Sequence, residues 1–269
     1  ATQALKSTDV VTQSYVVRVT DAKGAYVDQT VVVTVNGTND TPVATSTTAA
    51  KVGAVTEASV TDAGSSTVAG TLSASDVDST SSKTWAVEGP NSTTYGDFTL
   101  DAETGAWAYA LNNGLQATQA LRAGEVVTQS YVVRVTDDQG ATAEQTVVVT
   151  INGSNDAPTV ANVLADTVGA VTEAGDAVAG TSTVSGTLAT SDVDAAATKT
   201  WSVNGANSTT YGAFTVNATT GVWTYVLDNS LSTTQALKTN AQVNETFTVR
   251  ATDEFGATVD QLITVTING

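Results

Sequence analysis

The sequence predicts an all-β protein of tandem Greek-key β-sandwiches, with about seven strands in each repeat of 116 residues. Apolar and polar residues alternate with period 2 along most of the chain, and Gly, Asn and Asp interrupt the alternation at short intervals, as expected for strands joined by turns. The sequence also repeats itself without a gap, because Trp85 recurs as Trp201 and Asp76 as Asp192, each 116 positions later.

The expected strands of one repeat follow from this alternation. They cover residues 55–58, 70–75, 83–88, 96–100, 105–111, 127–136 and 142–151. Turns at 101–105 and 137–140 close two hairpins, each with one apolar face. These faces are expected to carry Phe98, Leu100, Trp107, Tyr109 and Leu111, and then Tyr131, Val133, Val135, Val147, Val149 and Ile151. The four tryptophans are expected in the core rather than as sugar-stacking platforms, since aromatic residues on such faces are usually buried.

The repeat also sets the expected domain boundaries, which fall just after two Asn-Asp pairs. Residues 1–40 are the last strands of an incomplete repeat, residues 41–156 form one repeat, and residues 157–269 form a second. The segment ATQALK at residues 1–6 returns as ATQALR and TTQALK at the matching places. Because a lone hairpin is marginal in water, we expect residues 1–40 to be ordered only by packing against the neighbouring repeat, or to have been cut from a longer array.

Composition excludes several classes of function. Acidic residues outnumber basic ones 27 to 10, and a net charge of −17 repels nucleic-acid backbones. Without Cys or His there is no disulfide, no thiolate or imidazole metal ligand and no histidine base. No apolar run reaches the roughly 20 residues of a membrane span. No signal peptide opens the chain, and the missing initiator Met indicates a fragment.

The candidate metal-ligating residues lie where the best strands end. The stretches VNGTNDTP and INGSNDAP each set an Asn-Asp pair before a proline. Calcium prefers six to eight oxygen ligands, which Asn155 and Asp156 could supply together with Asp192 and Asp194 of the next repeat. In an extended stretch the latter two carboxylates point to the same side. A turn-forming role without metal stays open, since Asx side chains also satisfy their own backbone.

A family resemblance rests on the segments GTLSASDVD, YGDFTLDAETGAWAYALNN, TQALRAGE and YVVRVTDDQGATAEQTVVVTINGSNDAP. They resemble the VCBS repeat of very large bacterial surface proteins, including RTX adhesins. This repeat is in turn similar to cadherin domains, immunoglobulin-like sandwiches joined end to end with calcium at each junction. The resemblance implies a cadherin-like fold for nearly the whole chain.

The resemblance also extends the expected set of calcium ligands. At the middle junction it adds Asp253 from the downstream repeat, and Glu57, Asn112 and Asn113 from the upstream one. Asn112 stands where cadherins carry an acid, and its equivalent Asp228 keeps the acid. The corresponding residues of the earlier junction are Asn39, Asp40, Asp76, Asp78 and Asp137.

The function that this resemblance implies is structural. We expect extender repeats of a secreted bacterial cell-surface adhesin, stiffened by Ca²⁺ at the junctions and supporting cell adhesion and biofilm formation. Their partners would be neighbouring repeats, with host or surface ligands held by other domains. A glycan- or cell-binding module and a strand-exchanging subunit of an extracellular fibre remain alternatives. Catalysis is not expected: the paired acids Asp76 and Asp78 resemble a glycosidase pair, but both repeats carry them beside a junction.

Overall fold

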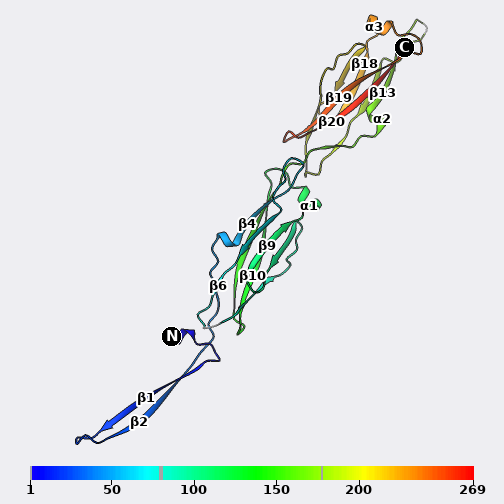
Figure 1. Cartoon of the computed structure of the whole chain (residues 1–269). Coiled ribbons are helices and arrows are strands. Elements are labelled where there is room, and N and C mark those ends of the chain that lie inside the picture. Colours follow the sequence, from blue (N-terminus) through cyan, green and yellow to red (C-terminus); the bar gives the residue numbers. More distant parts are fainter. Residues whose placement is uncertain (1, 79–80, 177) are drawn as a thin grey trace. The chain divides into compact units, whose positions relative to one another are not determined.

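The computed structural model describes residues 2–78, 81–176 and 178–269, and it is built almost entirely of β-strands (Figure 1). The predicted all-β fold class is confirmed. Short helical turns interrupt the strands: η1 (Thr2–Ala4), η2 (Ala49–Lys51), α1 (Gln116–Gln119), α2 (Leu164–Thr167) and α3 (Ser232–Gln235). Among the described residues, no helix has the length and apolar character needed to cross a bilayer.

The chain divides into two compact units. Unit 1 comprises Ala1–Val55, Ser66–Asn112 and Val127–Ile151, and unit 2 comprises Thr56–Ser65, Asn113–Val126 and Asn152–Gly269. The loops 56–65 and 113–126 therefore belong to the same compact unit as the second repeat. This division places the candidate ligands of each junction within one unit, except that Asn112, expected at the middle junction, belongs to unit 1.

Unit 1 contains one sandwich and one extra hairpin. Its strands are β1 (Val10–Thr20), β2 (Tyr26–Asn36), β3 (Val43–Ala44), β4 (Val52–Thr56), β5 (Thr67–Thr71), β6 (Ala74–Ser75), β7 (Lys83–Glu88), β8 (Gly96–Leu100), β9 (Ala106–Leu111), β10 (Val126–Asp137) and β11 (Thr142–Asn152). In the described part of the chain, one sheet has the order β4-β11-β10-β7 and the facing sheet the order β5-β9-β8. Together they supply the seven strands that the sequence predicts, while the short pair β3 and β6 adds to them.

Two strands of the sandwich differ from their expected limits. The strand expected over residues 55–58 is β4, which begins at Val52 and ends at Thr56, so Glu57 lies outside it. The segment 70–75 is divided between β5 and β6. The Glu57 N–H still donates to the carbonyl of Asn152, the last residue of β11, so strand pairing ends at this point, while the carboxylate accepts hydrogen bonds from Gln119 and Ser154.

The core of unit 1 is the predicted apolar face. Val133, Val135, Val147, Val149 and Ile151 are all completely buried, as is Phe98 from the other sheet. The Phe98 ring stacks on Tyr131 with their centroids 4.2 Å apart, so the two sheets are held by an aromatic contact across the sandwich. Trp85 and Trp107 are 7% and 2% exposed, which confirms that they are core residues.

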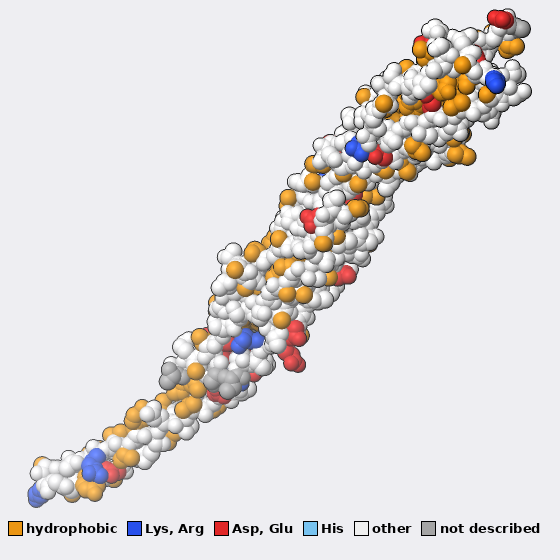
Figure 2. Space-filling view, turned by 45° about the horizontal axis from the view of Figure 1, so that its top comes forward, with side chains coloured by type: hydrophobic (Ala, Val, Ile, Leu, Met, Phe, Trp, Pro, Cys, Tyr) orange, Lys and Arg blue, Asp and Glu red, His pale blue; other side chains and the backbone are white. Residues whose placement is uncertain are grey.

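The hairpin of β1 and β2 lacks such a cover. Its strands pair from Val10 with Asn36 to Thr20 with Tyr26, and nearly every residue is exposed (Figure 2). Tyr15 is 50% exposed, whereas Tyr131, its equivalent 116 residues later, is 3% exposed. The hairpin therefore retains the paired backbone of the last two strands of a repeat, without the opposite sheet.

Unit 2 repeats the sandwich. Its strands are β12 (Thr159–Val160), β13 (Val168–Thr172), β14 (Thr183–Thr187), β15 (Thr190–Ser191), β16 (Lys199–Val203), β17 (Gly212–Val216), β18 (Val222–Leu227), β19 (Gln242–Asp253) and β20 (Thr258–Asn268). The described residues form sheets of order β13-β20-β19-β16 and β14-β18-β17. The pairing of β13 with β20 is parallel, and the other strand pairs of these two sheets are antiparallel. Trp201, Trp223 and Phe247 are buried in the core between the sheets.

Candidate metal centre

The second linker, residues 151–158, brings polar groups onto two loops of the repeat that follows it. The Asn155 amide Nδ2 donates a hydrogen bond of 2.9 Å to Asp253 Oδ2. The backbone N–H of Asp156 donates one of 3.0 Å to Asp194 Oδ2. The linker pair predicted as ligands therefore lies directly against two carboxylates predicted to complete the same site, all of them in unit 2.

Two carboxylates of the downstream repeat, those of Asp253 and Asp192, accept hydrogen bonds from backbone N–H groups of their own loops. Asp253 Oδ1 accepts hydrogen bonds of 2.9 Å from the N–H groups of Phe255 and Ala257, in a turn where Gly256 has φ of +92°. Asp192 Oδ1 accepts one of 3.1 Å from the N–H of Asp194. The turn-forming role of Asx residues is thus real, but it uses only one oxygen of each carboxylate.

Glu57 brings a further carboxylate into unit 2. It is fully buried, with Oε1 accepting from Gln119 Nε2 at 3.0 Å and Oε2 from the N–H of Ser154 at 3.3 Å. Its own N–H donates to the carbonyl of Asn152 at 2.9 Å. Gln119 and Ser154 were not among the predicted site residues. The motif TQAL recurs in the sequence, whereas Ser154 has Thr38 as its equivalent, and none of these residues carries a charge, so only their position in the fold reveals their role.

Burial, and after it the charges of neighbouring acids, raises the pKa of three carboxyls of this cluster. Burial, followed by the charges of Asp156 and Asp194, raises the pKa of Glu57 to about 7. Burial and then the charges of Asp192, Asp156 and Asp253 raise the pKa of Asp194 to about 6. Burial and the charge of Asp192 likewise raise the pKa of Asp156. These shifts show a set of carboxylates within electrostatic range of one another in a region of restricted hydration.

Several oxygens of the cluster lack a donor. Asp156 Oδ2 and Asp194 Oδ1 are buried and accept no hydrogen bond from the described residues. None of the ion pairs in the described part of the chain brings Lys or Arg to Glu57, Asp156 or Asp194. A buried carboxylate oxygen without a donor or a cation is costly. The arrangement therefore favours binding of a cation.

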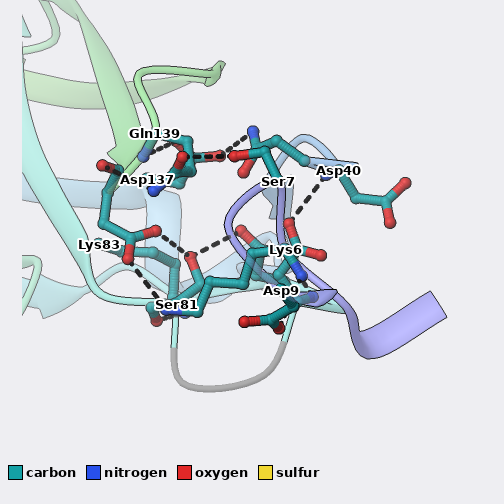
Figure 3. Close-up of polar contacts among 12 residues, drawn as sticks. Lys6, Ser7, Asp9, Asp40, Ser81, Lys83, Asp137 and Gln139 are labelled. Atoms are coloured by element: carbon teal, nitrogen blue, oxygen red, sulfur yellow. Dashed lines mark hydrogen bonds and ion pairs between the residues drawn. The ribbon is translucent and has the colours of Figure 1, made fainter. Parts of the chain in front are cut away.

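The first linker, residues 35–42, repeats these contacts within unit 1 (Figure 3). Asn39 Nδ2 donates to Asp137 Oδ2 at 3.0 Å, and the N–H of Asp40 donates to Asp78 Oδ2 at 2.8 Å. The N–H of Asp78 donates in turn to Asp76 Oδ1 at 3.0 Å. Each contact has its counterpart 116 residues later, so the two linkers are held by the same scheme.

The first site also has buried oxygens without donors. Asn39 Oδ1 and Asp78 Oδ1 accept no hydrogen bond from the described residues. Although burial acts to raise it, the hydrogen bond from Asn39 and those from turn N–H groups lower the pKa of Asp137. The carboxylate of Asp40 points away from Asp137 in Figure 3, while its backbone faces the site.

The other residues named from the family resemblance have contacts of a different kind. Asn112 is exposed and follows β9, and its backbone N–H donates to the carbonyl of Tyr95. The neighbouring Asn113 accepts a hydrogen bond of 3.0 Å from the N–H of Ala58 through its Oδ1. Asp228 is likewise exposed, with Oδ1 accepting from the N–H of Ser230 at 2.8 Å. Glu173, the counterpart of Glu57, is half-buried and directly follows β13.

The donor atoms at these linkers suit some metals and not others. No group of three or more His, Cys, Asp or Glu side chains within the described ranges converges closely enough to hold a metal ion as it stands. The available donors are carboxylate, amide and backbone oxygens, which suit a hard cation such as Ca²⁺ and exclude sites that need nitrogen or sulfur ligands. The oxygens without donors fit such an ion, and small side-chain movements would be needed to converge on it.

Comparison with known proteins agrees with the fold and with the repeat. The sequence model of a family described as "Bacterial cadherin-like domain" matches residues 39–153 and again residues 155–269. No curated protein sequence matches the chain.

The structure is also similar to solved cadherin structures. PcdhgB3 EC1-4 superposes with a TM-score of 0.52 and 14% sequence identity, covering 96% of this chain and 66% of that one. The protocadherin GammaB4 extracellular domain superposes with a TM-score of 0.50 and 16% identity, covering 96% of this chain and 43% of that one. This chain thus spans less than two thirds of either structure, and at such identities the likeness concerns the fold.

Proposed function

Because the chain belongs to the family of bacterial cadherin-like domains, matched over residues 39–153 and 155–269, we propose that its repeats are extenders whose joints are stiffened by Ca²⁺. The observation that carries this proposal is the cluster of buried carboxylates with oxygens that lack a donor. It occurs at both linkers, which fits a repeated structural ion better than a single catalytic cleft. The role proposed is therefore structural and not enzymatic.

The ligands proposed for the second joint come from both sides of the linker. Glu57 belongs to the upstream repeat, Asn155 and Asp156 to the linker, and Asp192, Asp194 and Asp253 to the downstream repeat. The first joint would use Asn39, Asp40, Asp76, Asp78 and Asp137. A bound Ca²⁺ would supply positive charge to these oxygens and so tie the linker to the loops that it contacts.

Electrostatics gives the joint two states. Without a cation, two like charges about 4 Å apart repel by roughly 1–4 kcal/mol, depending on the local dielectric. With calcium this repulsion becomes attraction, and the joint stiffens. Extracellular calcium modules bind with Kd of about 10⁻⁴–10⁻³ M, so the repeats would be flexible at cytosolic calcium and stiff outside the cell.

The wider context proposed is a secreted bacterial surface adhesin. The four segments that resemble the VCBS repeat, together with the family match, support an extracellular array that gives reach in cell adhesion and biofilm formation. Neighbouring repeats of the same long chain are then the main partners. Ligands on hosts or surfaces would be bound by other domains.

The test is calcium removal. At a calcium concentration about 100 times Kd, ligand linkage predicts roughly 2.7 kcal/mol of stabilisation, so EGTA should lower the Tm measured by circular dichroism. Small-angle X-ray scattering should at the same time show a broader range of particle lengths. If calcium changes neither the Tm nor the scattering, the proposal fails.

A variant separates the joint from the folded repeat. Asp192→Ala with Asp194→Ala should abolish the calcium response of the second joint while both sandwiches still fold. The matched control is the exposed Asp176→Ala, which removes an acid of unit 2 outside the cluster and should leave the response intact. Unfolding of the second repeat by the double change would assign these acids to the core instead.

One observation favours a second candidate, a strand-exchanging subunit of a fibre. The β1–β2 hairpin exposes Tyr15, Val17 and Val31, whose equivalents in the complete repeats are buried. A sheet from another chain could cover this face. Light scattering would then show a concentration-dependent oligomer that Tyr15→Ser with Val31→Ser abolishes, and a monomer at all concentrations would exclude it.

A further inference from the structure

A second set of contacts lies beside the candidate calcium ligands and uses opposite charges. In unit 1, Lys6 Nζ lies 3.2 Å from Asp138 Oδ2, and both side chains are mostly buried, at 17% and 27% exposed. The next residue adds a neutral contact, because Ser7 Oγ donates to Gln139 Oε1 at 2.7 Å (Figure 3). Lys6 and Ser7 precede the first linker, whereas Asp138 and Gln139 belong to the repeat that follows it.

The same contact recurs in unit 2 with different residue types. Arg122 Nη1 lies 3.6 Å from Glu254 Oε1, at positions 116 residues after Lys6 and Asp138. A backbone hydrogen bond of 3.1 Å from the N–H of Ala195 to the carbonyl of Ala120 lies in the same region of the chain. Lys6 faces an aspartate and Arg122 faces a glutamate. Both side chains therefore differ between the two units, but each pair still joins a basic residue to an acid.

These acids differ from the neighbouring candidate ligands in the partner that they face. Asp137 and Asp253 take hydrogen bonds from turn backbone and from a linker asparagine. Asp138 and Glu254, one residue later, also accept hydrogen bonds within their own repeats, from Ser81 Oγ and from the N–H of Thr198, but each faces in addition a cation supplied by the protein itself. Their attraction to Lys6 and Arg122 needs no metal.

These pairs are also distinct from the other ion pairs that repeat along the chain. Arg18 with Asp28, Arg134 with Glu144, and Arg250 with Asp260 each join two strands of one hairpin, at nitrogen to oxygen distances of 2.7 Å. They stabilise a hairpin and cross no linker. The pairs Lys6–Asp138 and Arg122–Glu254 instead connect residues on either side of a linker.

We propose that Lys6–Asp138 and Arg122–Glu254 form a metal-independent latch, in which a basic residue at the end of one repeat pairs with an acid of the next and restrains the joint when calcium is absent. The turn at residues 21–24 lacks the acid of the latch, because Ala22 stands at the position of Asp138 and Lys23 at that of Gln139. Asp21 still stands at the position of the candidate calcium ligand Asp137. Joints built on such a turn would respond to calcium but lack the latch. Lys238, which lies 116 residues after Arg122 and is exposed, is the basic residue at the equivalent position of the second repeat.

The experiment measures, in the full chain, the distribution of distances between one label on each side of the second joint. The width of this distribution reports how far the joint bends. Because the chain has no Cys, Thr99→Cys with Thr215→Cys places two spin labels at equivalent exposed positions of the two repeats. Electron–electron double resonance is recorded in EDTA, so the result does not depend on calcium binding. Arg122→Glu should broaden the distance distribution. We expect the fraction of molecules with a bent joint to rise two- to fivefold, since an exposed ion pair contributes only modestly to the free energy of a conformation.

Charge reversal gives the decisive comparison. Arg122→Glu combined with Glu254→Arg should restore the width of the parent, and high salt should broaden the parent by screening the pair. Arg250→Glu, the matched control within one hairpin, should leave the width unchanged. An unchanged width for Arg122→Glu, or a swap that does not restore it, overturns the latch. Failure of calcium to narrow the parent would instead overturn the proposed calcium joint, so the two ideas fail separately.

Discussion

The substitution Asp194→Asn tests the buried carboxylate cluster most directly. Asp194 is 5% exposed, Oδ2 accepts from the N–H of Asp156, and Oδ1 accepts from no described residue. Asparagine keeps an oxygen for the Asp156 N–H and removes the charge. Its amide can also donate to a neighbouring carboxylate oxygen.

The pKa shift sets the expected magnitude and its sign. The pKa of Asp194 rises from an ordinary 3.8 to about 6, chiefly through burial, so the folded chain binds this proton more tightly than the unfolded chain. Stability from this group is therefore fully present below pH 3.8 and is lost as the pH rises through 6. At 1.36 kcal/mol per pKa unit, the ionised carboxylate costs the metal-free fold about 2–3 kcal/mol at pH 8.

The assay is thermal unfolding of the full chain between pH 5 and pH 8 in EDTA and in calcium. The Asp194 contribution alone should make the Tm of the metal-free parent roughly 5 °C higher at pH 5 than at pH 8. With a pKa of about 6 in the folded chain, about 1.4 kcal/mol of this contribution is lost within that window, and each kcal/mol shifts the Tm of a domain of this size by several degrees. Asp194→Asn should remove this part of the pH dependence, while the part from Glu57 remains, and it should raise the Tm at pH 8 in EDTA. In calcium at pH 8 the order should reverse, because the parent gains the ion and the variant does not.

The control is Asp176→Asn, an exposed acid in the same unit, which should track the parent throughout. The window lies above the range in which carboxylates with lowered pKa, such as Asp137, take up protons. A metal-free parent whose Tm is constant or falls from pH 8 to pH 5 would refute the reasoning. So would an Asp194→Asn variant that matches the parent in EDTA.

Three further outcomes follow from the packing. Backbone amides of β1 and β2 should exchange with deuterium far faster than those of β10 and β11, because the hairpin lacks a covering sheet; equal protection measured by mass spectrometry would contradict this. Phe98→Ala should cost about 3–5 kcal/mol in urea unfolding, since it removes a fully buried ring stacked on Tyr131, and a loss below about 1 kcal/mol would argue against that core. Gly70→Ala should destabilise by about 1–3 kcal/mol, because a Cβ there would lie 2.7 Å from Trp107 Nε1, whereas Gly175→Ala, with open space around it, should show no such loss in the same measurement.

Much of the fold was predictable because its signals are local. Alternation with period 2 identifies β8 and β7 at the residues where they occur, and it places Trp107 and Tyr109 together on the buried face. Strand β4 was misplaced by three residues at its start, since Val52 and Gly53 carry no clear alternation. The short helical turn α1 at the TQAL motif was not predicted, because four residues carry too little periodic signal.

The candidate site was predictable in its residue types but not in its arrangement. The Asn-Asp pairs and their 116-residue recurrence pointed to Asn155, Asp156 and Asp194, and the structure brings these groups together. Glu57 was expected from the family resemblance alone, and its full burial under Gln119 could not be read from the sequence. Neutral partners such as Gln119 give no chemical signal until they lie beside a charge.

The sequence by itself determined the β class, the period of 116 residues, the apolar faces and the places where acids recur. Those properties depend on residues that are close along the chain or repeat at a constant spacing. Only the tertiary structure decided that Glu57 meets Ser154 across 97 positions, that Asp194 Oδ1 and Asp156 Oδ2 are buried without a donor, and that Arg122 faces Glu254. The physical reason is that solvation, pKa and ion pairing depend on every group within a few ångströms, and folding brings those groups together from distant parts of the chain.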